Sequence, residues 1–244
     1  MRQGALRHRE LHEEITDVVE VETSSREEHW GVVMCNAITS ITQLRSQGIC
    51  REIPLIGQIN GTWVVGVADQ IKRTPRGYVL SDHKTRKRPT MPSQAQQKTT
   101  HLQLMIYNTM YKQLQQGLPQ DLFFNDFQLD PQKQFQDDLP TLLKQKQIAA
   151  QNLQEMFHLF CTTFAQAPTL STTMEISYEW QRDNTAIGTD RFHFSQEFLQ
   201  QHLTKGMSYW NGLRQAEVVP MNERWKCKFC DFTTKCRATR THLQ

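Results

Sequence analysis

Two apolar runs that each lead into a carboxylate constrain the fold of this chain more than any other feature. The first, Trp63–Val67, has the β-branched character of a buried strand and leads to Asp69. The second, Tyr78–Leu80, leads to Asp82 and Lys84. A Thr-Pro-Arg-Gly sequence between the runs is typical of a turn, so we expect the two strands to form a hairpin. This hairpin predicts a sheet with two acidic side chains close together.

The charged residues that follow these strands have a clear chemical use. Side chains alternate along a strand, so Asp82 and Lys84 point to the same face, and Asp69 can lie beside them. Carboxylate oxygens are ligands that Mg²⁺ prefers, and such an ion activates water and neutralises phosphate charge. A lysine ammonium can orient that water and stabilise the charge of the transition state. The alternative is a solvated hairpin, because Asp and Lys are common on protein surfaces.

The helix expected next, over residues 101–116, carries two polar residues of interest. Its apolar residues recur at helical spacing. Gln103 and Tyr107 are four residues apart, so their side chains share one face of the helix, beside the apolar stripe. An Asp, an Asp-x-Lys and a helix with Gln-x-x-x-Tyr, in this order, form a combination far more specific than any of its parts.

A basic run lies directly after the Asp-x-Lys sequence and consists of Arg86, Lys87 and Arg88. Charge runs usually form a solvated face. Here the run lies beside the predicted metal site, where a phosphodiester backbone would pass, so we expect these residues to contact DNA.

The N-terminal residues 4–14 predict a helix with one histidine next to the metal site. Gly4 and His8 are one helical turn apart, and His8 is the candidate metal ligand. His12 falls on the same helical face and is the competing candidate. A solvated side chain is the alternative for either histidine.

The remaining elements complete a mixed sheet with helices on its faces. Strands near residues 52–57, 62–69 and 77–84 should be adjacent, with an Asn-Gly turn between the first two. We also expect strands at 17–21, 122–129, 175–180 and 187–194, a polar connection up to 147, and helices over 27–47, 148–165 and 196–213. These elements predict an α/β fold.

Composition is that of a globular protein in a reducing compartment. The 244 residues include 38% hydrophobic and 22% charged residues, with a formal net charge of +3. No apolar run is long enough to cross a bilayer, and the first residues do not lead into a signal-peptide core. The chain therefore is expected to be intracellular, with its six cysteines reduced.

Three of those cysteines cluster near the C-terminus. Cys227, Cys230 and Cys236 have the spacing Cys-x2-Cys-x5-Cys. Thiolates gathered this closely bind zinc or an iron–sulfur cluster. With His242 they could instead form a Cys3His zinc site in a non-catalytic nucleic-acid-binding module, and structural cysteines without metal are a further alternative.

Taken together, these motifs resemble the RecB-type branch of the PD-(D/E)xK nucleases, and within it the exonuclease V (defects-in-morphology) family. The likeness covers nearly the whole chain. It implies a restriction-endonuclease-like core and a Mg²⁺- or Mn²⁺-dependent exonuclease that hydrolyses single-stranded DNA in repair. The roles it implies are metal binding by His8, Asp69 and Asp82, and catalysis by these aspartates with Lys84, Gln103 and Tyr107.

The same resemblance implies a [4Fe–4S] cluster that uses Cys227, Cys230 and Cys236. In the family, the fourth cysteine lies upstream of the Gly-x-x-x-His helix, with which this sequence begins, so we expect that ligand to be missing. The other cysteines, Cys35, Cys50 and Cys161, do not match it, and the helical ones, Cys35 and Cys161, are expected in the core. An inactive truncated nuclease is therefore a further alternative. Residues 1–220 are expected to form the nuclease core and 221–244 a cysteine segment packed on it.

Partners and location follow from the resemblance alone. It implies single-stranded DNA as substrate, a single-strand DNA-binding protein as partner, a monomer, and no membrane. Vertebrate relatives are nuclear, so a nuclear location is expected, with the mitochondrion or cytoplasm as alternatives.

Overall fold

The computed structural model describes residues 2–15 and 21–236. Four of the five residues of the strand expected at 17–21 lie outside this range. The chain divides into two compact units, which are described separately. The first comprises Met1–Met91 and Thr100–Phe194, and the second Pro92–Thr99 and Ser195–Gln244.

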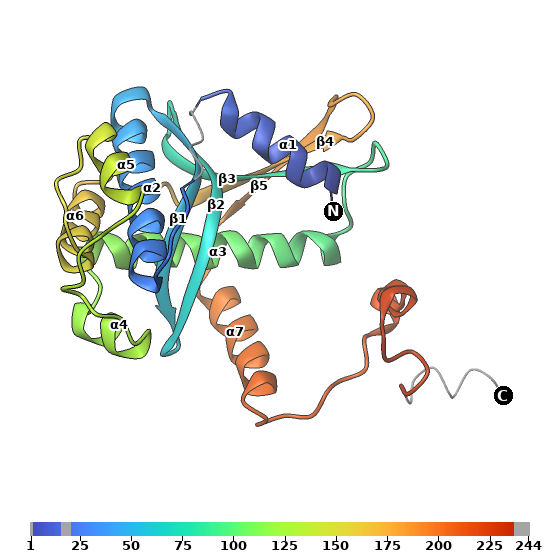
Figure 1. Ribbon diagram of the computed structural model, residues 1–244. Coiled ribbons are helices and arrows are strands. Elements are labelled where there is room, and N and C mark those ends of the chain that lie inside the picture. The colour runs from blue at the N-terminus through green and yellow to red at the C-terminus, as the bar shows by residue number, and fades with distance from the viewer. Residues whose placement is uncertain (1, 16–20, 237–244) are drawn as a thin grey trace. The chain divides into compact units, whose positions relative to one another are not determined.

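A five-stranded mixed sheet forms the centre of the first unit, and this confirms the predicted α/β class (Figure 1). Neighbouring strands pair in sequence order, antiparallel except for the parallel pair β3–β4. The expected hairpin is β2–β3. The strands are β1 (Ile49–Ile59), β2 (Thr62–Thr74), β3 (Gly77–Arg86), β4 (Thr173–Trp180) and β5 (Ala186–His193).

Helices cover this sheet. Helix α2 packs on β1 and on α6, with α5 beside it (Figure 1). The predicted long helix is α2, which begins one residue before the expected position 27, after Ser25, whose side chain accepts the Glu28 N–H. It ends at Gly48, in the left-handed conformation with φ 77°. The helices are α1 (Arg2–Glu13), α2 (Arg26–Gln47), α3 (Gln94–Gln116), α4 (Gln120–Asp126), α5 (Leu139–Gln145) and α6 (Leu153–Ala165).

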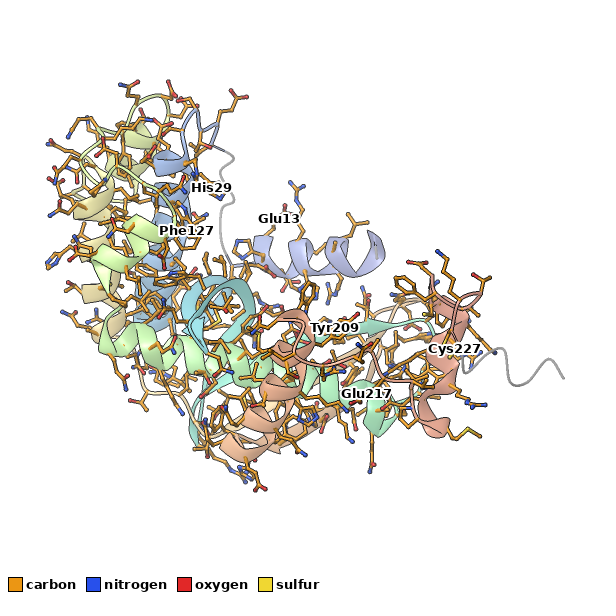
Figure 2. All side chains as sticks on the ribbon, turned by 90° about the horizontal axis from the view of Figure 1, so that it is seen from below. Glu13, His29, Phe127, Tyr209, Glu217 and Cys227 are labelled. Carbon is orange, nitrogen blue, oxygen red and sulfur yellow. The ribbon has the colours of Figure 1, made fainter. Side chains whose placement is uncertain are left out.

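The strand expected at residues 122–129 is wrong, because α4 occupies this segment. Its phenylalanines have helical rather than alternating spacing, and they join an aromatic cluster with α2 and α6. Phe123 lies 5.1 Å from Trp30 and 5.2 Å from Phe157 between ring centroids, and Phe127 (labelled in Figure 2) lies 4.9 Å from Trp30. Packing against two helices therefore determines the structure of this segment.

Other boundaries differ from the prediction as well, and three of the differences concern helices. The polar connection contains the short helix α5, whose leucines Leu139, Leu142 and Leu143 are buried. Helix α6 begins at Leu153 rather than 148, because the Asn152 side chain caps it by accepting the Glu155 N–H. Helix α3 begins seven residues earlier than expected, directly after Pro92 and Ser93.

The second unit contains the helix α7 (Gln196–Trp210) and the 3₁₀ helix η1 (Met221–Phe229). The Ser195 side chain caps α7, as predicted for a helix starting at residue 196. Figure 2 labels Cys227, which lies in η1. None of the described helices is both long enough and apolar enough to span a bilayer.

Candidate active site

A histidine and two carboxylates from three elements converge at one point of the first unit. The ligand atoms of His8 on α1, Glu52 on β1 and Asp69 on β2 all lie within 4.8 Å of one another. His8 Nδ1 is 3.4 Å from Glu52 Oε1 and 3.5 Å from Asp69 Oδ2. The interaction with Glu52 raises the pKa of His8 above its ordinary value. Within residues 2–15 and 21–236, no other three His, Cys, Asp or Glu side chains are grouped this closely.

His8, Glu52 and Asp69 line a cavity with a volume of about 30 Å³. Asp82 on β3 borders this cavity as well. Its side chain is 1% exposed, and Oδ1 accepts a hydrogen bond from Lys84 Nζ at 2.9 Å. Burial and the adjacent Asp69 charge raise the pKa of Asp82 to about 7. Its Oδ2 atom is buried and has no partner among the described residues. A hard divalent cation would supply the missing partner.

The site lies where β3 changes neighbours. The pairing of β3 with β2 ends at the Gln70–Ser81 pair, and its parallel pairing with β4 begins at Ser81. Beyond this point the Asp69 carboxylate, rather than the β2 backbone, accepts the His83 N–H at 2.9 Å. Asp69 and Asp82 thus line the cavity at the point where the pairing of β2 with β3 ends.

Glu52 is the site residue that the sequence analysis did not identify. It has φ 50°, a left-handed conformation that is uncommon for a residue with a side chain, and it interrupts the β1–β2 ladder between Arg51 and Ile53. The predicted Asn-Gly hairpin contained a signal that could have identified Glu52. Counting outward from its first pair, Ile59–Thr62, places Glu52 opposite Asp69.

The competing histidine occupies a different position. His12 lines an open groove beside the cavity, and it is not part of the close group. Its Nδ1 is buried with no partner among the described residues, and burial lowers its pKa. His8 also binds the His83 carbonyl through Nε2 at 2.8 Å, which fixes its ring. Of the two candidates, the structure brings His8 to the carboxylates.

Helix α3 presents the predicted Gln-Tyr pair at the sheet. Gln103 Nε2 donates to the Tyr107 hydroxyl at 3.2 Å. The Tyr107 ring lies over Gly66, where an added Cβ would come within 2.6 Å of Cε1, so this position requires glycine. Burial opposes the charge of Lys84, but Asp82 outweighs it, and with contributions from Asp69 and Tyr107 the pKa of Lys84 is raised. Lys84 is therefore a cation held between the acidic cavity and α3.

The basic run is only partly solvated. Lys87 and Arg88 are exposed, whereas Arg86 is half-buried at the end of β3. Its Nε atom is buried and has no partner among the described residues. The backbone here is fixed from β4, since the Gln181 N–H donates to the Arg86 carbonyl at 2.9 Å and the Trp180 Nε1–H to the Lys87 carbonyl at 3.2 Å.

A groove of about 790 Å³ lies between α1 and β3, beside the group formed by His8, Glu52 and Asp69. Gly4, one turn before His8, contributes to its wall, and a Cβ there would lie 3.5 Å from Thr85 Oγ1. The lining includes Gly4, His8, Glu52, Lys84, Thr85 and Gln181.

The C-terminal cysteines are not grouped at the spacing of ligands to a single ion. No close set of three possible ligands in the described part of the chain includes Cys227, Cys230 or Cys236. In the first unit, Cys35 and Cys50 are buried, and burial raises the pKa of their thiols to about 11 and 12. Cys161, expected in the core, is half-buried.

Comparisons with known proteins identify the family of the chain. The chain matches the family described as "Exonuclease V - a 5' deoxyribonuclease" over residues 1–78, 72–148 and 137–238. It is 28% identical over 227 residues to Exonuclease V of Danio rerio, covering 91% of this chain and 57% of that protein. The chain thus spans little more than half the length of this relative. The crystal structure of SSO0001 aligns with 86% of this chain and 69% of its own, with a TM-score of 0.39 and 12% identity. Because the family match extends over most of its length, the chain belongs to the exonuclease V family.

Proposed function

We propose that this protein is a metal-dependent exonuclease that hydrolyses phosphodiester bonds of single-stranded DNA, and that it acts in DNA repair. The observation that carries the proposal is the cavity at His8, Glu52 and Asp69, into which a buried Asp82 contributes an unpartnered oxygen. A lysine next to this cavity, Lys84, completes the set of groups that phosphodiester hydrolysis needs.

The donor set fits a hard divalent cation. Three carboxylates and one imidazole border a volume with room for about one ion or water molecule. Such donors suit Mg²⁺ or Mn²⁺. His8, Glu52, Asp69 and Asp82 would hold the ion, which when bound lowers the pKa of water and neutralises phosphate charge.

The remaining residues act on water and phosphate. The ammonium of Lys84, held by Asp82 at 2.9 Å, orients the attacking water and stabilises the negative charge that develops on the phosphate. Gln103 and Tyr107 restrict the position of Lys84 or of a phosphate oxygen, and neither transfers a proton. Because Tyr107 sits on Gly66, its hydroxyl is fixed relative to β2.

The substrate strand follows the groove between α1 and β3. Lys87 and Arg88 are exposed beyond it and contact phosphates, and a phosphate oxygen would also give the buried Arg86 Nε a partner. The preference for single-stranded over duplex DNA is proposed from the family resemblance.

Asp82→Asn tests the catalytic proposal. This variant keeps the side-chain volume but loses a negative charge, so cleavage of a labelled single strand in Mg²⁺ should fall at least 10²-fold while strand binding persists. Glu175→Gln, on β4 and outside the cavity, is the matched control and should cleave at the wild-type rate. Unchanged cleavage by Asp82→Asn would place the active site elsewhere.

For the C-terminal cysteines we propose three ligands of a [4Fe–4S] cluster. A four-iron cluster takes four thiolates, so the described residues do not complete the set, and no step above depends on it. Iron with a visible absorption band in the purified protein would support the cluster. Zinc in its place would support the Cys3His alternative.

Location and partners complete the proposal on the basis of sequence resemblance. We propose a nuclear monomer that meets single-stranded DNA coated by a single-strand DNA-binding protein. Imaging of the tagged protein tests the location, and light scattering tests the oligomeric state. Co-purification with the DNA-binding protein tests the partner.

A further inference from the structure

Glu179 on β4 lies close to both α1 and β3 near His8, but it is not one of the candidate metal ligands. Its carboxylate oxygen Oε2 accepts a hydrogen bond from Arg7 Nε of α1 at 3.1 Å. The same oxygen lies 3.1 Å from His83 Nε2 of β3. Glu179 is 18% exposed and Arg7 19%, so water screens the pair only in part. The Arg7 guanidinium stays charged, as arginine does in proteins, and it donates this hydrogen bond.

This contact bears on the metal ligand because Arg7 precedes His8 on α1. Without a metal ion, His8 reaches β3 through Nε2, which lies 2.8 Å from the His83 carbonyl oxygen. Glu179 lies 3.1 Å from the His83 ring, but the hydrogen bond it accepts is the one from Arg7 on α1. The Arg7–Glu179 and His8–His83 contacts together hold one turn of α1 against the sheet.

We propose that Glu179 is a positioning residue, which holds α1 against the sheet so that His8 faces Glu52 and Asp69 before a metal ion binds. This inference rests on the proposed function of the cavity. It states that the affinity for a divalent ion depends on a carboxylate that does not contact the ion.

The physical reason is preorganisation. An ion that binds to an undocked α1 must also order the helix, and the cost of that ordering is subtracted from the binding free energy. Removing the Glu179 charge leaves Arg7 half-buried with only Glu10 and Glu14 of its own chain segment nearby, at 3.3 and 4.0 Å. Arg7 would then favour solvent over the sheet.

Strand β4 supplies a matched control. Glu175, four residues before Glu179, is 12% exposed and binds two cations, Lys72 at 2.9 Å and Arg191 at 2.8 Å. Both partners are on strands of the sheet, and neither is on α1. Glu175→Gln therefore removes charge contacts of a half-buried carboxylate on the same strand without touching the element that carries His8.

The experiment is a titration of the full chain with Mn²⁺ in the absence of DNA. Electron paramagnetic resonance measures the binding. Glu179→Gln should raise the Kd for Mn²⁺ by about 10-fold or more, as is usual for residues that orient a ligand. Glu175→Gln should bind as the wild type does. Arg7→Met should lose a similar factor, and the double variant with Glu179→Gln should lose no more than either alone, because both remove the same contact.

Two results separate this inference from the proposed metal site. Asp69→Asn should abolish specific Mn²⁺ binding, and if it does not, the site itself is wrong. If Asp69→Asn abolishes binding but Glu179→Gln and Arg7→Met bind like the wild type, only the positioning role is overturned.

Metal-free hydrogen exchange over residues 4–13 gives a second measure, and it should be faster in Glu179→Gln than in Glu175→Gln. Equal exchange in the two variants would also overturn the inference. Should Glu179→Gln fail to fold, the Arg7→Met variant on the helix surface carries the same expectations.

Discussion

At the scale of single residues, the buried carboxylate of Asp82 is central to the site, because its two oxygens have different surroundings. Oδ1 of Asp82 holds Lys84, and Oδ2 is buried without a partner among the described residues. An unpaired buried oxygen costs about 1–3 kcal/mol, and a cation bound at the site would remove this cost. The arrangement is understandable if a cation and a phosphate complete it.

Lys84 and Tyr107 should respond to substitution in a graded series. Lys84→Ala removes the cation next to the reacting phosphate, so the cleavage rate should fall roughly 10²–10³-fold. Tyr107→Phe retains the ring that packs on Gly66 and loses only the hydroxyl that receives Gln103, so its loss should be smaller. Single-turnover cleavage, with strand affinity measured in Ca²⁺, separates the two effects. Wild-type cleavage by Lys84→Ala would be incompatible with its assigned role.

At the scale of elements, the groove and the basic run define the path of the strand. Lys87 and Arg88 are exposed, so each forms a phosphate contact that depends on salt. Replacing both with alanine should reduce the slope of log affinity against log salt by about 1.4, at about 0.7 per contact with a single strand. Lys144→Ala, an exposed lysine on α5, is the control. Binding isotherms across a salt series measure the slope. An unchanged slope in the double variant would show that Lys87 and Arg88 do not contact phosphates.

The elements also show how far the sequence alone could lead. The hairpin, its turns and the long helix α2 were predictable, because alternation, turn residues and capping residues are local signals. Helix α4 was not, because its phenylalanines are fixed by Trp30 and Phe157 from distant segments. Propensity is a weak guide where tertiary packing of this kind decides the structure.

The candidate site divides in the same way. Asp69, Asp82 and Lys84 were found because they follow strands that a local pattern predicts. Glu52 depends on the register of two strands, and Glu179 on a parallel pairing between β3 and a strand more than eighty residues later. The Asn-Gly turn sets the register that places Glu52 opposite Asp69, so a local signal for Glu52 was present. The parallel pairing that places Glu179 has no local signal, and this carboxylate required the structure.

At the scale of the whole molecule, carboxylates with opposite pKa shifts determine how stability varies with pH. Glu28 is buried, and although burial opposes its charge, hydrogen bonds from Gln136 and Ser24 outweigh this and lower its pKa. Its contribution is present above the unfolded pKa of about 4.3 and is lost as pH falls below it. Asp82 has the opposite sign, because its folded pKa of about 7 exceeds the unfolded value.

In the metal-free protein, Asp82 should therefore contribute a loss of stability as pH rises from about 4 to 7. Over this range the folded state binds a proton at Asp82 that the unfolded state has released, and the loss is about 2–4 kcal/mol. Asp82→Asn carries no such charge, so it should lack this decline and exceed the wild type in stability at pH 8 in EDTA, although it is inactive. Mn²⁺ should restore stability to the wild type at pH 8 and have less effect on Asp82→Asn. Urea unfolding at a series of pH values, with and without Mn²⁺, measures all four curves. The difference between the wild-type and Asp82→Asn curves in EDTA isolates Asp82 from the other titrating groups. A difference that stays constant between pH 4 and 7 would show that Asp82 is not the strained carboxylate of this site.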